Sequence, residues 1–205
     1  MRSLLLAALV FVATPFASAQ VTFGLKGGLN TSFYSGPSSD GLDPKLGAVG
    51  GAVVRFDVNP GFGIGLEALY SQKGAKYVDP VNSEFDETYA FDYIEIPAYV
   101  RLSVPIGQTL DGGVTLGGYA GIPIKTGGND IDGDFDLEAN TDYGALIGLD
   151  VGSGPYYVEG RYSLGLAQVS DDDTFFLDLP ANELPDLKNQ TVSLTFGVRF
   201  GGSRY

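Results

Sequence analysis

The chain has 205 residues, with 25 Asp and Glu against 12 Lys and Arg, a formal net charge of -13, and no Cys, His or Trp. The missing Cys and His exclude disulfides, imidazole metal sites and nucleophiles activated by His, so we do not expect an enzyme. The negative charge opposes phosphate backbones, so we expect no nucleic-acid partner.

The first 19 residues have the pattern of a secretory signal peptide. Arg2 gives a positive start, an apolar run follows over 4–16, and Ala17-Ser18-Ala19 is the small-x-small motif that signal peptidase cuts. The run is short for a membrane-spanning helix, and the alternative of a retained anchor lacks a second charged flank. We predict a signal peptide over 1–19 and a single domain over 20–205.

The remaining chain is predicted to form eight strands with apolar side chains at every second position. In the last of them, Val192, Leu194 and Phe196 alternate with polar residues. Patterns typical of helices, a cap followed by a 3.6-residue period, do not occur. The predicted strands lie near 21–32, 46–57, 63–74, 92–103, 112–124, 141–152, 156–166 and 191–200.

Short and long connections alternate along the chain. This alternation puts the short turns at one end of an up-and-down meander and the long loops at the other, as in outer-membrane barrels. The strands also exceed the 5–6 residues typical of soluble proteins and reach the ~9–11 that span a membrane. We therefore predict an all-β fold, an eight-stranded antiparallel up-and-down transmembrane β-barrel of the bacterial outer membrane. The short turns are 58–62, 104–111 and 152–154, and the long loops are 33–45, 75–89, 125–139 and 169–187.

Eight charged residues alternate with the apolar face and are predicted to point into the barrel. They are Lys26, Arg55, Glu67, Glu95, Arg101, Glu159, Arg161 and Arg199. Eight strands leave an interior that side chains can fill, so these groups are expected to pair with one another as a lumen charge network with five bases and three acids. A narrow channel for cations or small solutes is the first alternative. A soluble, lipocalin-like periplasmic binding calyx, with its apolar face inward, is the second.

Several segments resemble the PorT-type outer-membrane β-barrel family of Bacteroidetes-like bacteria. They are the segments Gly24-Leu25-Lys26-Gly27-Gly28-Leu29-Asn30, Leu66-Glu67-Ala68-Leu69-Tyr70-Ser71-Gln72-Lys73-Gly74, Tyr93-Ile94-Glu95-Ile96-Pro97 and Gly117-Gly118-Tyr119-Ala120-Gly121. The resemblance extends over 21–200 and implies an outer-membrane barrel. Because some members of that family are linked to secretion or gliding machinery, the resemblance also implies a link to protein secretion. It supplies no reaction and no ligand.

Two details of the sequence depart from the usual pattern of outer-membrane barrels. Pro97 lies within a predicted strand and cannot donate a hydrogen bond to the ladder, so a bulge is predicted there. The aromatic residue that commonly ends a barrel's last strand is either Phe200 or Tyr205.

The four long loops hold 17 of the 25 acidic residues and only three lysines. In one loop, Asp130, Asp132, Asp134 and Asp136 alternate like the start of a calcium loop, but the glycine position and the missing helices do not match an EF-hand. We therefore expect no cofactor and a solvated acidic surface, with weak Ca²⁺ binding as the alternative. The expected partners are outer-membrane lipid and envelope or secretion proteins, and the chain is expected to be a monomer.

Overall fold

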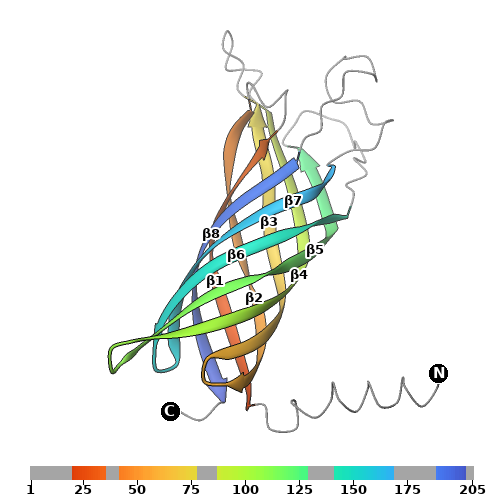
Figure 1. The fold of residues 1–205 in the computed structure, drawn as a ribbon. Helices are drawn as coiled ribbons and strands as arrows, with labels where there is room; N and C mark the ends of the chain where they lie inside the picture. Colours follow the sequence, from red (N-terminus) through yellow and green to blue (C-terminus); the bar gives the residue numbers. More distant parts are fainter. Residues whose placement is uncertain (1–19, 36–41, 78–86, 129–140, 169–187, 202–205) are drawn as a thin grey trace, which may run out of the picture.

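The fold is a closed barrel of eight antiparallel strands in chain order, with β8 pairing back to β1 (Figure 1). The computed structural model describes residues 20–35, 42–77, 87–128, 141–168 and 188–201. Within these ranges no helix is long and apolar enough to cross a membrane. The strands are β1 Gln20–Ser35, β2 Leu42–Asn59, β3 Phe62–Tyr77, β4 Glu87–Ile106, β5 Leu110–Gly128, β6 Asp142–Ser153, β7 Tyr156–Gln168 and β8 Lys188–Gly201.

The predicted alternation is confirmed, with the apolar face on the outside. Leu25 and Leu194 are 58% and 63% exposed, whereas their neighbours Lys26 and Thr195 are 6% and 4% exposed. Charged and aromatic side chains fill the interior. An outer wall of aliphatic and aromatic side chains around a charged interior is the arrangement that a lipid environment stabilises, and it is the reverse of a soluble calyx.

The three short turns lie at the same end of the barrel, as predicted (Figure 1). Gln20, where the described chain begins, pairs with Asp57 next to the β2–β3 turn, and Gly201, where it ends, pairs with Thr22, so both lie at the short-turn end. Seven of the strands are longer than predicted, up to 20 residues in β4, whereas β6 has the predicted 12 residues. Phe200 lies on the outer face next to Phe23 of β1, while Tyr205 lies outside the described residues.

The bulge predicted at Pro97 is wrong. Pro97 pairs with Tyr119 of β5 without a register shift, and the shift in this ladder lies at Asp92 and Tyr93 instead. Toward β3, the pairs Leu66–Ala98 and Leu69–Glu95 keep a single register across a gap in the ladder. The missing donor of Pro97 therefore coincides with a gap of two positions in the β3–β4 ladder, without adding a residue to the strand.

The connection predicted over 104–111 is mostly strand. β4 continues to Ile106 and β5 begins at Leu110, so the turn itself covers only 107–109. Gly107 has a φ of 69°, a left-handed conformation that glycine adopts without steric cost. Pro105 and Gly107 suggested a longer turn, but the alternation of Leu102, Val104 and Ile106 carries the strand through them.

Candidate functional site

The candidate site is the charged interior of the barrel. All eight residues predicted for the lumen charge network lie on the inward-facing side of their strands: Lys26, Glu67, Glu95, Arg101, Glu159 and Arg161 are buried, and Arg55 and Arg199 are half-buried. The structure sorts them into three clusters along the barrel axis. We name these the outer, central and short-turn clusters.

The central cluster joins four of the predicted residues, Lys26, Glu67, Glu159 and Arg161. Lys26 Nζ lies 2.8 Å from Glu67 Oε2 and 3.1 Å from Glu159 Oε2. Arg161 donates two hydrogen bonds to the Glu67 carboxylate, at 2.8 and 3.0 Å, and also contacts Glu159 at 2.6 Å. Two bases and two acids thus cross-link β1, β3 and β7, strands that are not neighbours in the barrel wall.

The outer cluster lies toward the long-loop end and is built around Lys73. Its ammonium group pairs with Glu95 and, at 2.8 Å, with Asp142. The same group lies 5.4 Å from the ring centre of Tyr93 and 4.7 Å from that of Tyr119. One lysine therefore holds two carboxylates and two aromatic rings together, with ion pairs and cation–π contacts in a buried setting.

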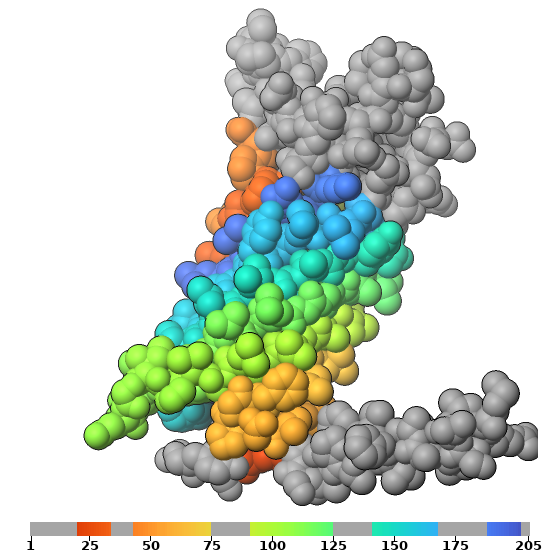
Figure 2. All heavy atoms as spheres, in the orientation of Figure 1, coloured from red at the N-terminus to blue at the C-terminus, as the bar shows by residue number. Residues whose placement is uncertain are grey.

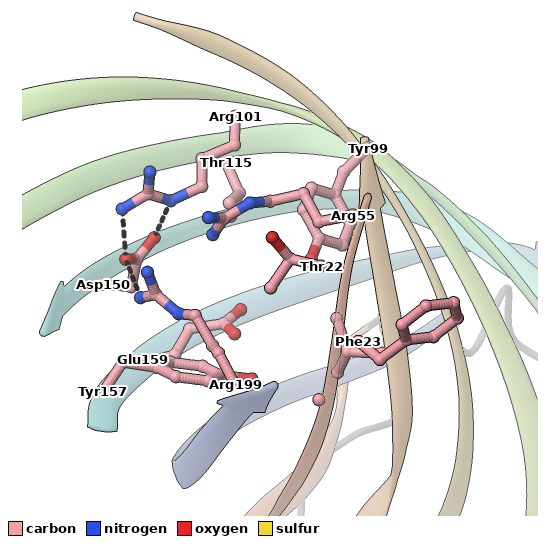
Figure 3. Close-up of a pocket in the computed structure, with 12 residues that line it drawn as sticks. Thr22, Phe23, Arg55, Tyr99, Arg101, Thr115, Asp150, Tyr157, Glu159 and Arg199 are labelled. Carbon is pink, nitrogen blue, oxygen red and sulfur yellow. Dashed lines mark hydrogen bonds and ion pairs between the residues drawn. The ribbon is translucent and has the colours of Figure 1, made fainter. Parts of the chain in front are cut away.

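The short-turn cluster is centred on Asp150 of β6. Arg101 donates to both of its carboxylate oxygens, at 2.8 and 2.6 Å, and Arg199 approaches it at 3.4 Å (Figure 3). Both arginines also reach Asp111, at 3.0 and 3.5 Å. Figure 3 shows Arg101, Asp150 and Arg199 converging from β4, β6 and β8.

Two features complete the short-turn cluster. Arg55 pairs at 2.7 Å with Asp57 of its own strand, and Arg199 lies over the Tyr157 ring at 4.5 Å. A cavity of about 20 Å³ lies among these side chains. A space of this size has room for roughly one water molecule.

The expected pairing of the eight residues with one another holds only for the central cluster. Glu95, Arg55, Arg101 and Arg199 take partners that the sequence reasoning did not single out. The expected balance of five bases to three acids is also wrong. Within the described residues the ion-paired interior has six bases and seven acids: Lys26, Arg55, Lys73, Arg101, Arg161, Arg199, Asp57, Glu67, Glu95, Asp111, Asp142, Asp150 and Glu159.

The ion-pair partners that were not predicted can be found from the two-residue alternation of the strands. Lys73 shares the inward parity of Glu67 on β3, and Asp142 shares that of Asp150 on β6, so counting by twos along each strand finds them. The predicted acidic cation site, Asp130, Asp132, Asp134 and Asp136, lies outside the described residues. Among the residues that are described, no group of three or more acidic side chains is arranged to hold a metal ion.

A closed eight-stranded barrel with a lipid-compatible outer wall and a polar interior defines a transmembrane β-barrel protein. A family described as outer membrane protein beta-barrel domain matches residues 16–171, and the chain belongs to this family. It is a small outer-membrane protein of the bacterial envelope. The finer assignment to the PorT type is not part of this match. No curated protein matches the chain.

Solved structures of other small barrels are similar to this chain. Outer membrane protein OprG from Pseudomonas aeruginosa is 10% identical with a TM-score of 0.55, over 90% of this chain and 98% of that one. Ail, the attachment invasion locus protein of Yersinia pestis, solved with the heparin analogue sucrose octasulfate, is 12% identical with a TM-score of 0.46, over 88% and 99%. Neisserial surface protein A is 9% identical with a TM-score of 0.47, over 87% and 97%. At such identities the likeness to OprG supports the fold alone.

Proposed function

We propose that this protein is a closed outer-membrane barrel with a structural or interaction role, which presents its acidic loops on the outer side of the membrane. The observation that carries the proposal is the ion-paired interior. The central cluster crosses the lumen from β3 to β7, and clusters on either side of it fill the two ends. A lumen occupied by paired charges and tyrosine rings favours a rigid wall over a water-filled path.

Burial of the central cluster supports a role in fixing the strands. Glu67 is 2% exposed and Arg161 is 7% exposed, so each would be an uncompensated charge without its partner. Removing one partner of a buried pair typically costs about 3–5 kcal/mol. The pairs therefore favour the one register in which β1, β3 and β7 bring these groups together.

Conduction of cations is the second candidate, and the outer cluster is the observation in its favour. One lysine there faces two carboxylates, and the buried Asn30 Oδ1 and Asn189 Oδ1 have no hydrogen-bond partner among the described residues. An excess of buried acceptors attracts cations. The central cluster, which has equal numbers of bases and acids, lies below and opposes onward passage.

Planar-bilayer recording separates these two candidates. The closed-barrel proposal predicts no steady unitary steps from the folded protein at neutral pH, and reproducible cation-selective steps would overturn it. The interaction role needs a different test, because a closed barrel does not name its partner. Purification of the intact protein from its own outer membrane should retain envelope or secretion proteins, and a chain that is recovered alone at native abundance would contradict that role.

The link to secretion is proposed from the resemblance to PorT-type barrels. We also propose that the protein is not an enzyme and carries no cofactor, since the chain offers neither His nor Cys for the usual hydrolytic chemistry of membrane barrels. The proposed partners are outer-membrane lipid and envelope proteins, and the proposed state is a monomer.

A further inference from the structure

The β4–β5 hairpin extends beyond both of its neighbours at the short-turn end. The last pair between β3 and β4 is Phe62–Leu102, and the pairing of β5 with β6 begins at Asp111 and Gly152. The tip, residues 103–110, is held by the β4–β5 pairs from Ser103–Gly113 to Ile106–Leu110, and the Ser103 amide also donates to Gly61 O at 2.9 Å. At ~3.3 Å per residue, β4 runs roughly 13 Å past its last pair with β3, whereas on the β6 side only Leu110 precedes the pairing. Figures 1 and 2 show it, in green, as a projection to the side of the barrel.

The two faces of this tip differ in chemistry. Val104, Ile106 and Leu110 share the outward parity of the barrel's apolar wall, and each is between 44% and 51% exposed. The opposite face carries Ser103 and Asp111, which both contact Arg101 of the short-turn cluster. The tip is therefore amphipathic, and its apolar face continues that of the lipid-contacting wall.

Hairpin length and aliphatic content set this tip apart from the other two short turns, 58–62 and 152–156, which also carry no charge. Residues 102–110 contain no charged side chain, and four of them are large aliphatic residues. The β2–β3 and β6–β7 hairpins end in tight turns, whose last pairs are Asn59–Phe62 and Ser153–Tyr156. An apolar projection of this length in water would expose a patch that soluble surfaces avoid.

We propose that the 103–110 tip is an interfacial anchor, whose apolar face rests on phospholipid in the periplasmic leaflet of the outer membrane. Short turns of outer-membrane barrels face the periplasm, which assigns the leaflet. The depth of the tip in the membrane follows from its unpaired backbone groups. Residues 104–106 have no partner on the β3 side and Leu110 has none on the β6 side, and unpaired peptide groups are costly in the hydrocarbon core. The headgroup region supplies water to those edges while the apolar face contacts the acyl-chain boundary.

The test uses the absence of Cys from the chain, which makes single-cysteine labelling specific. Nitroxide labels are placed at Ile106→Cys and Leu110→Cys in the full protein, folded into phosphatidylethanolamine–phosphatidylglycerol vesicles at a low protein-to-lipid ratio. Ile147→Cys on the lipid-facing wall is the lipid reference, and Asn59→Cys in the β2–β3 turn is the aqueous reference. Pro105→Cys, on the other face of the same hairpin, is the matched control. Accessibility to oxygen is compared with accessibility to a water-soluble nickel chelate.

If the tip is an anchor, the oxygen-to-nickel accessibility ratio at positions 106 and 110 should be several-fold above the ratio at the control positions 105 and 59. It should also be close to the ratio at the lipid reference, position 147. A ratio at 106 and 110 equal to that at 59 would overturn it. Spin–spin broadening between labels at 106 that persists on lipid dilution would also overturn it, because the face would then contact a second copy. The two labelled positions are independent, so one variant that fails to fold leaves the other decisive. Neither result depends on whether the lumen conducts.

Discussion

Replacing Arg161 with Met should be among the most destabilising single changes in the barrel wall. Arg161 makes four contacts of 2.6–3.0 Å to the carboxylates of Glu67 and Glu159, and it is 7% exposed. Without it, Lys26 alone faces two buried carboxylates. The loss of one partner from a buried pair gives an expected cost of about 3–5 kcal/mol.

The double variant Arg161→Met with Glu67→Gln tests whether the central cluster acts as one unit. Neutralising Glu67 restores the balance of one base to one acid, Lys26 with Glu159, so the second change should recover part of the loss. Residues within one network typically show coupling energies of about 0.5–3 kcal/mol. The assay is equilibrium urea unfolding of the protein in vesicles, for the wild type, both single variants and the double variant.

Arg55→Met is the matched control, since Arg55 pairs with Asp57 on its own strand and crosses no part of the lumen. Its expected cost is about 1 kcal/mol or less, the range of a partly exposed pair. The reasoning is refuted if Arg161→Met costs no more than Arg55→Met. It is also refuted if the effects of Arg161→Met and Glu67→Gln simply add, because the central cluster would then not act as a unit.

Three further predictions concern other parts of the barrel. Lys73→Met should lower the urea midpoint by more than Arg55→Met, since it leaves two carboxylates of the outer cluster without their base; an unchanged midpoint would show that the cluster adds no stability. Gly65→Ala should cost about 1–3 kcal/mol, because its new methyl group would overlap the tyrosine ring that covers it from β4, whereas Gly160→Ala, with open space, should change stability little. Similar losses in the two glycine variants would argue against this packing. Calcium should shift the thermal midpoint of wild type and of Asp132→Asn with Asp134→Asn equally, and a shift confined to wild type would establish a cation site in that loop.

Alternation in the sequence predicts which side chains of each strand face outward and which face inward. The outward position of Leu25 and the inward position of Lys26 follow from the two-residue period, and the closed barrel follows from the strand count and the alternating turns. The same period gives the inward position of the eight predicted charges, and also that of five interior charges that were not predicted: Asp57, Lys73, Asp111, Asp142 and Asp150. It fails only where turn-forming residues interrupt an otherwise alternating run, as at Pro105.

The partner of each charge could not be predicted in this way. Arg161 meets Glu67 across 94 residues of sequence, and that contact depends on the relative register of strands that are not adjacent. The register follows from the accumulated pairing of every hairpin around the barrel, which no single segment encodes. Pro97 illustrates the same limit, because its effect on the ladder depends on which neighbour its missing donor faces.

Planar-bilayer recording of the folded protein tests the closed-barrel account most directly. Three clusters lie along the lumen, so removing the base of the outer one should leave the path blocked by the central cluster. The account therefore predicts that both wild type and Lys73→Ala give no steady unitary conductance at neutral pH. Reproducible cation-selective steps from the wild type, or steps that appear in Lys73→Ala alone, would contradict it.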